Sequence, residues 1–157
     1  MAYNILIAFD DSPNAMRAVE HVAKFFNPSN KVTLLSILHD TAALCDMNSP
    51  ELTAYFLSQR SSFCAIEEKK KSLIEGALKE GKQVLINAGF NDENVIIKAI
   101  VKNNGIARDI VDEATSSGYD IIVMGRRGLS GIKEFFLGSV SQKVLHGARE
   151  VSILMVN

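Results

Sequence analysis

The hydrophobic positions of the chain follow two alternating patterns. Short continuous apolar runs recur along it, and such runs are typical of parallel strands that are covered on both faces. We predict strands at residues 4–9, 32–38, 95–101, 120–124 and 152–156. Between these runs, apolar residues return at the spacing of a helix with one buried face.

The segments between the runs also carry signals for where helices begin and end. Ser12 is a good N-cap, and Pro13 suits the first helical position. In the weakly patterned stretch after the second run, we expect Ser49 or Pro50 to open a short helix through Leu57. The longer helices are predicted at residues 13–26, 67–88, 106–114 and 140–148.

Strands and helices alternate to the end of the sequence. Such alternation, with right-handed crossovers, predicts a Rossmann-like α/β fold: an open parallel sheet of five strands with helices on both faces. No linker, low-complexity tract or repeat interrupts the pattern, so we expect residues 1–157 to form a single domain. Ligands of such sheets bind outside the carboxyl ends of the strands, near the point where the strand order reverses.

Composition removes several classes of function. The chain has 157 residues, 47% of them hydrophobic and 22% charged, with a net charge of −1. These values fit a globular protein and give no sign of nucleic-acid binding, and no apolar run approaches the ~20 residues of a membrane helix. The only cysteines are Cys45 and Cys64, which excludes a disulfide framework and a cysteine-rich zinc site. We therefore expect a cytoplasmic protein with reduced thiols.

Candidate chemistry gathers where the fourth strand ends. Gly125 and Gly128 leave that strand, and residues 138–141, Gly-Ser-Val-Ser, open the last helix. Glycines allow close approach to a ligand, and a helix N-terminus attracts anions. We expect a base or ribose near the first two glycines and phosphates at residues 138–141. Neither the phosphate-binding P-loop nor the GxGxxG dinucleotide fingerprint occurs.

The glycine spacing resembles a known family. Gly125-x2-Gly128-x9-Gly138-Ser139 is similar to the nucleotide motif of universal stress proteins, and residues 5–12 also fit. The resemblance covers essentially the whole chain. It implies the strand order 3-2-1-4-5, binding of ATP or AMP, Mg²⁺ or Mn²⁺ accompanying ATP, and a homodimer through the last strand.

The resemblance also implies which residues contact the nucleotide. Asp10 would lie near the adenine and ribose, although it could simply cap the first helix. Ser139 and Ser141 could likewise serve only as helix caps. The sequence departs from the family pattern at Asp11, often glycine, and at Ile106, often proline. The positions expected at the nucleotide are Ala8, Asp10, Ile37, Met124, Gly125, Arg127, Gly128, Gly138, Ser139, Val140 and Ser141.

The predicted function is that of a stress-response regulatory protein that binds an adenine nucleotide. We expect binding to change the order of the loop between Gly128 and Gly138 and so to signal to an unidentified protein partner. The sequence shows no nucleophile, base and orienting group together, so any ATP hydrolysis should be weak. Two alternatives remain open: a slow ATP hydrolase or autophosphorylating protein that uses Ser139 or Ser141, and an interaction module with a vestigial nucleotide site.

Overall fold

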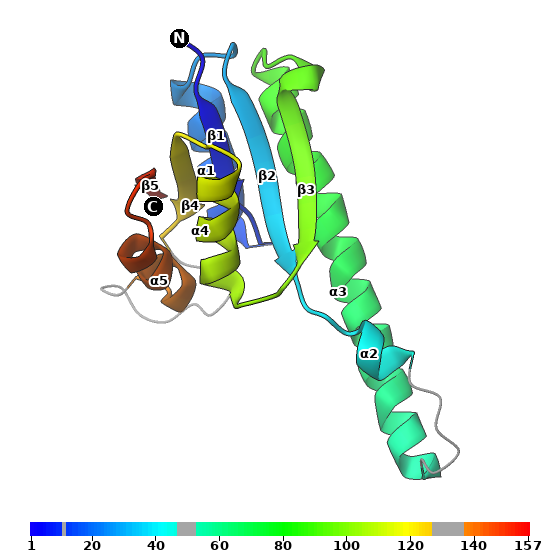
Figure 1. Cartoon of the computed structure of the whole chain (residues 1–157). Helices are drawn as coiled ribbons and strands as arrows, with labels where there is room; N and C mark the ends of the chain where they lie inside the picture. Colours follow the sequence, from blue (N-terminus) through cyan, green and yellow to red (C-terminus); the bar gives the residue numbers. More distant parts are fainter. Residues whose placement is uncertain (11, 47–52, 127–136) are drawn as a thin grey trace.

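The chain folds around one parallel sheet. A computed structural model describes residues 1–10, 12–46, 53–126 and 137–157. The sheet has the order β3-β2-β1-β4-β5 (Figure 1), so the predicted fold class and strand order are confirmed. The strands are β1 (Asn4–Ala8), β2 (Lys31–Leu38), β3 (Val95–Val101), β4 (Ile121–Gly125) and β5 (Ser152–Val156).

Helices cover both faces of the sheet, as predicted. Along β1, Ile5 and Ile7 point into one apolar cluster and Leu6 and Ala8 into the other. Helices α1 and α3 pack on the first face, and α4 and α5 on the second (Figure 1). The described helices are α1 (Pro13–Phe25), α2 (Ala42–Cys45), α3 (Ala54–Asn87), the 3₁₀ turn η1 (Asp92–Asn94), α4 (Ile106–Ser116) and α5 (Ser139–Gly147).

Helix α1 begins where the sequence predicts. The side-chain oxygen of Ser12 accepts a hydrogen bond from the backbone N–H of Ala15 at 3.1 Å. Pro13 occupies the first turn, where its missing N–H costs nothing. The carboxyl end of β1 is thereby joined to a helix whose direction is fixed within a few residues.

Helix α3 differs from the prediction. The sequence suggested a short helix ending at Leu57 and a separate helix from Glu67, but the structure has one helix of 34 residues that begins at Ala54. Thr53 caps it by accepting the N–H of Phe56 at 3.2 Å. No residue of α3 before Leu78 is buried, which explains why this half of the helix gave no clear pattern of buried positions. The expected opening at Ser49 or Pro50 lies outside the described residues.

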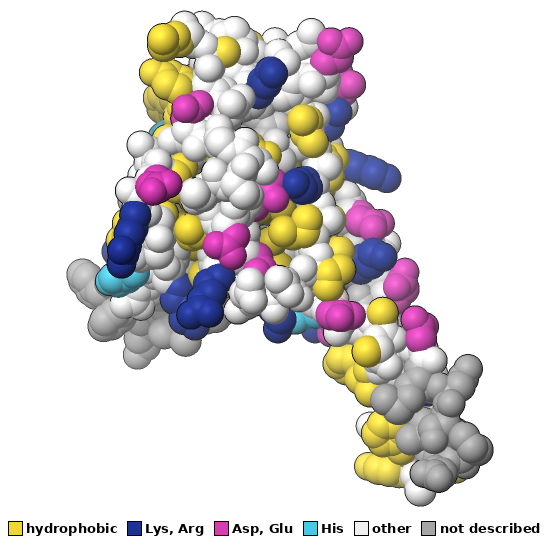
Figure 2. Space-filling model, viewed as in Figure 1, with side chains coloured by type: hydrophobic (Ala, Val, Ile, Leu, Met, Phe, Trp, Pro, Cys, Tyr) yellow, Lys and Arg dark blue, Asp and Glu magenta, His cyan; other side chains and the backbone are white. Residues whose placement is uncertain are grey.

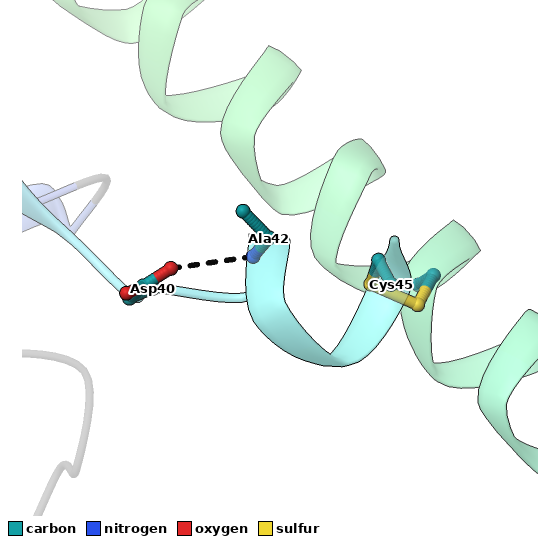
Figure 3. Close-up of a disulfide and its surroundings, with 4 residues drawn as sticks. Asp40, Ala42 and Cys45 are labelled. Atoms are coloured by element: carbon teal, nitrogen blue, oxygen red, sulfur yellow. Dashed lines mark hydrogen bonds between the residues drawn. A yellow bond between two sulfur atoms is a disulfide. The ribbon is translucent and has the colours of Figure 1, made fainter. Parts of the chain in front are cut away.

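The expectation of reduced thiols is wrong. Cys45 and Cys64 form a disulfide, with their Cα atoms 5.9 Å apart (Figure 3). The bridge joins the one-turn helix α2 to the first half of α3, two elements that the sequence pattern did not resolve. Two cysteines are too few for a framework of bridges, but they suffice for one. Composition therefore gives no support for a reducing compartment.

Two polar contacts fix α4 against the sheet. The buried carboxylate of Asp109 accepts the backbone N–H groups of Asn103 at 2.7 Å and Asn104 at 2.9 Å. These bonds hold the turn after β3 and lower the pKa of Asp109. On β3, Lys98 donates to Glu113 of α4 at 2.7 Å, and this bond raises the pKa of Lys98.

Asp109 predicts a specific loss of stability in acid. Its pKa is lower in the folded state than in the unfolded chain, so its stabilising effect is present above about pH 4 and disappears as the pH falls through the folded-state pKa. Asp109→Asn should lower the melting temperature near pH 7, with the deficit shrinking towards about pH 2. Thermal melts across this range measure the effect. The exposed Asp112→Asn variant of the same helix should behave like the unmodified protein, and an equal deficit in both variants would contradict the assignment.

Candidate functional site

A cavity of about 430 Å³ opens at the carboxyl ends of β1, β2 and β4. These strands lie where the sheet order reverses, because β1 pairs with β2 on one side and β4 on the other. The cavity is lined by every described residue that the sequence placed at the nucleotide: Ala8, Asp10, Ile37, Met124, Gly125, Gly138, Ser139, Val140 and Ser141. Arg127, Gly128 and the loop expected to change its order lie wholly or largely outside the described residues.

The end of β1 supplies a carboxylate to the rim of this cavity. Asp10 accepts the backbone N–H of Ser12 at 3.0 Å, a local turn of the kind that aspartate favours. Ser12 in turn caps α1. Asp10 therefore does not cap the helix itself but bonds the residue that does, and it lines the cavity as well.

The start of α5 is tied to the end of β4. The buried hydroxyl of Ser141 donates to the carbonyl oxygen of Gly125 at 3.1 Å, and the N–H of Gly138 donates to the carbonyl of Arg126 at 3.0 Å. Ser141 therefore does not cap the helix, because its hydroxyl donates to the end of β4 instead. Gly138 precedes the helix and has no side chain to cap it. The first N–H groups of α5 consequently form an anion-attracting end at the cavity wall.

Gly125 has a packing reason of its own. A Cβ atom at this position would lie 2.7 Å from the carbonyl oxygen of Asn14 in α1. The missing side chain lets α1 approach the end of β4, which the sequence analysis did not foresee because it attributed the glycine to the ligand. The close approach brings the entries of α1 and α5 to the same cavity.

Several residues of the cavity were missed by the sequence analysis. Lys70 and Ile74 of α3 reach it, as do Ile106 and Ile110 of α4. Lys70 appeared to belong to a solvated face, and it does pair with Glu67 at 3.0 Å. Its place at the cavity follows from how α3 crosses the sheet, which no local pattern reveals. The apolar stripe of α4 was visible, but only as core.

A second depression lies between α4 and α5, next to the cavity. Its volume is about 1150 Å³, and it shares Ile106, Ser139 and Val140 with the cavity. Its walls carry the basic residues Lys102, Arg108, Lys143 and His146 and the acidic residue Asp112. The start of α5 therefore borders a mainly basic groove.

The described residues show no cluster of metal ligands. None of their histidines, cysteines, aspartates and glutamates form a group of three or more that could hold an ion. Asp10 and His39 are the only such side chains that line the cavity within the described part. Within the described ranges, no helix combines the length and the apolar character needed to cross a membrane.

The chain matches one protein family over its whole length. A profile described as "Universal stress protein family" matches residues 1–157. Universal stress protein YxiE of Bacillus subtilis is 32% identical over 149 residues, with 92% of each chain covered.

Solved structures show the same fold. The protein MJ0577 of Methanocaldococcus jannaschii matches with a TM-score of 0.63 and 26% identity, over 100% of this chain and 98% of the other. A universal stress protein in complex with cAMP gives a TM-score of 0.64 at 21% identity. Another from Archaeoglobus fulgidus, in complex with dAMP, gives 0.58 at 16%. Both cover 100% of this chain and 98% of the other.

The contact between Gly125 and Asn14 can be tested by adding one methyl group. Gly125→Ala should destabilise the fold by about 1–3 kcal/mol, because the helix backbone that the methyl meets cannot move aside cheaply. Gly76→Ala is the matched control, since a Cβ there meets nothing within 4 Å. It should stabilise α3 by about 0.5–1 kcal/mol. Urea denaturation measures both, and a neutral Gly125→Ala variant would show that α1 does not pack so closely.

Proposed function

Because the family match spans its whole length, the chain belongs to the universal stress protein family, and we propose that its cavity binds an adenine nucleotide as part of a stress-response regulator. One observation carries the proposal. Residues from the ends of β1, β2 and β4 and from the start of α5, chosen from sequence alone, converge on a single cavity.

The cavity has the two surfaces that a mononucleotide requires. Leu35, Ile37 and Met124 supply apolar wall for a planar base. The uncapped start of α5, at Ser139 and Val140, supplies N–H groups for phosphate oxygens. A volume of about 430 Å³ falls in the range of small-molecule sites. The basic groove beside Ser139 adds positive charge on the side where phosphates would lie.

The choice of an adenine nucleotide draws on the family. Two universal stress proteins with this fold were solved in complexes with cAMP and dAMP. These support adenine as the base and a phosphorylated ribose as its partner. Within that class we propose ATP or AMP as the ligand of this chain.

A divalent cation would enter with ATP rather than occupy a site of its own. Asp10 is the only carboxylate among the described residues that line the cavity, and the described chain holds no cluster of metal ligands. Mg²⁺ commonly keeps several waters and binds through one or two carboxylates and the phosphates of its nucleotide. We therefore propose that a divalent cation at this site arrives with ATP.

The structure favours binding over catalysis. In the described part of the cavity, Ser141 donates its hydroxyl to a backbone carbonyl, and no hydrogen bond joins Ser139 or Ser141 to a histidine or carboxylate. A nucleophile of this kind needs an adjacent base. We propose that nucleotide occupancy, rather than turnover, is the signal that a protein partner reads.

A cytoplasmic location is part of the proposal. A regulator that senses ATP or AMP must meet the cellular nucleotide pool. The disulfide between Cys45 and Cys64 is the observation that weighs against this location, because disulfides are rare in reducing compartments.

Ser139→Glu tests where the phosphates bind. The exposed Ser139 is the first residue of α5. A carboxylate there stabilises the helix but repels an anion. We expect ATP affinity to fall at least about tenfold, or about 1.4 kcal/mol, while adenosine affinity stays the same. Calorimetric titration of both ligands measures this.

The control keeps the site but adds no charge. The ATP affinity of Ser139→Ala should fall by less than about tenfold, since this substitution removes at most one hydrogen bond. An unchanged ATP affinity in the folded Ser139→Glu variant would place the phosphates elsewhere.

We also propose a homodimer through β5. This strand lies at the edge of the sheet and carries Ile153, Leu154, Met155 and Val156 without a charge or proline. Such an edge pairs readily with another strand. The N–H of Ser152 donates to the carbonyl oxygen of Asp120, just before β4, so alternation makes the N–H groups of Ile153 and Met155 point outward.

Met155→Pro should therefore remove an outward hydrogen bond and leave the pairing with β4 intact. We expect it to weaken the β5 dimer, while Met155→Leu keeps the native assembly. Light scattering at micromolar concentration compares the two variants. Identical masses for both would count against β5 as the interface.

A further inference from the structure

The first half of α3 carries an apolar stripe that the described chain leaves largely or partly exposed. We call residues 54–73 the stalk, because this part of α3 runs beyond the sheet (Figure 1). Figure 2 shows hydrophobic side chains gathered along one edge of it. The large exposed side chains on this stripe are Tyr55, Phe56, Phe63, Ile66 and Leu73.

The stripe continues the face that packs on the sheet. At about 100° per residue, Phe56, Phe63, Ile66 and Leu73 fall within an arc of about 100°. Ile74, at the end of this arc, already packs against the core. The same side of the helix is therefore buried beside the sheet and exposed along the stalk, where Ile66 is 56% exposed and Leu73 55%.

The disulfide leaves this stripe uncovered. Cys64 lies about 130° around the helix from the middle of the stripe. Its bridge to Cys45 attaches α2 to α3 at that position (Figure 3). The occupant of the stripe must therefore come from outside the described chain.

The spacing of the stripe is symmetric about its own centre. Counted from Phe56, the apolar positions follow at 7, 10 and 17 residues, so the series reads the same from either end. In an antiparallel pair of stalks, Phe56 would face the partner's Leu73 and Phe63 the partner's Ile66. Every layer would then pair one aromatic with one aliphatic side chain, which suits knobs-into-holes packing of two helices. Each preformed stalk would be about 30 Å long.

Charge favours the antiparallel direction. Lys70 is the only charged residue within the arc, and its amine is exposed apart from its pair with Glu67. Antiparallel pairing places Lys70 opposite the partner's Gln59, whereas parallel pairing would place it opposite the partner's Lys70. Like charges that face one another destabilise helix pairs.

The exposed area is large enough for a weak specific dimer. With fully exposed side chains of about 200 Å² each, the exposed fractions on the stripe amount to about 500 Å² per chain and about 1,000 Å² for a pair. That is about the smallest area expected of a specific interface. We propose that the stalk binds the stalk of a second copy of this chain in an antiparallel pair, through a surface separate from β5. Lys70 of this surface also lines the nucleotide cavity.

The first experiment compares two glutamates on opposite sides of the stalk. Sedimentation of the full chain should show Phe63→Glu lowering the mass of the native assembly by at least half. Ala65→Glu, exposed and about 130° from the middle of the stripe, should leave the mass unchanged. Circular dichroism checks that each variant is folded, and Ile66→Glu repeats the test if Phe63→Glu is not. A native chain that is monomeric, or equal masses for the two glutamates, would overturn the proposal.

The second experiment tests the register. Phe63→Lys and Ile66→Glu should each fail to pair with themselves but pair with one another when mixed, because the new lysine faces the partner's new glutamate. Phe56→Lys mixed with Ile66→Glu is the matched control, because these positions do not face each other. Any association of the two variants through β5 would occur equally in both mixtures. Equal pairing in the two mixtures, or none in either, would refute the antiparallel alignment.

Discussion

The parallel pairing of β1 with both β2 and β4 is the constraint on which the rest of the structure depends. It reverses the strand order at the centre of the sheet, and the carboxyl ends of three strands open there together. The crossovers then place α1 and α3 on one face and α4 and α5 on the other. The missing side chain of Gly125 lets α1 approach the end of β4, while the hydroxyl of Ser141 ties α5 to the same place. A cavity walled by apolar strand ends and a helix N-terminus is the direct result.

Elements with strong local signals could be predicted from the sequence. The apolar runs at β3 and β5 gave the observed bounds, and Ser12 with Pro13 located the start of α1. The opposite case is α3, whose first half has no fully buried residue, so its apolar residues carry no pattern of burial to interpret. The bridge between Cys45 and Cys64 was missed for a related reason, since it joins segments whose proximity depends on that unrecognised helix.

The residues of the candidate site also differ in whether a local signal or only the packing of helices places them there. The residues at strand ends and at the helix start, such as Ile37 and Val140, could be predicted because the topology brings them together. Lys70 and Ile74 could not be predicted, because their position at the cavity depends on the angle at which α3 crosses the sheet. Gly125 was predicted at the nucleotide and lines the cavity, but its close approach to the backbone of Asn14 was not foreseen. Chemistry set by chain order is thus visible in sequence, and chemistry set by packing angle is not.

The central claim is that the cavity at the strand ends holds an adenine nucleotide, and amide NMR of the full chain during titration with ATP tests it most directly. The account predicts shifts at Ile37 and at Ser139 and Val140 with one common affinity, and unchanged amides at Ala65 on the stalk. Absence of shifts at about 1 mM ATP, where even binding of about −4 kcal/mol would be visible, would contradict it. Shifts confined to residues outside the cavity would contradict it equally.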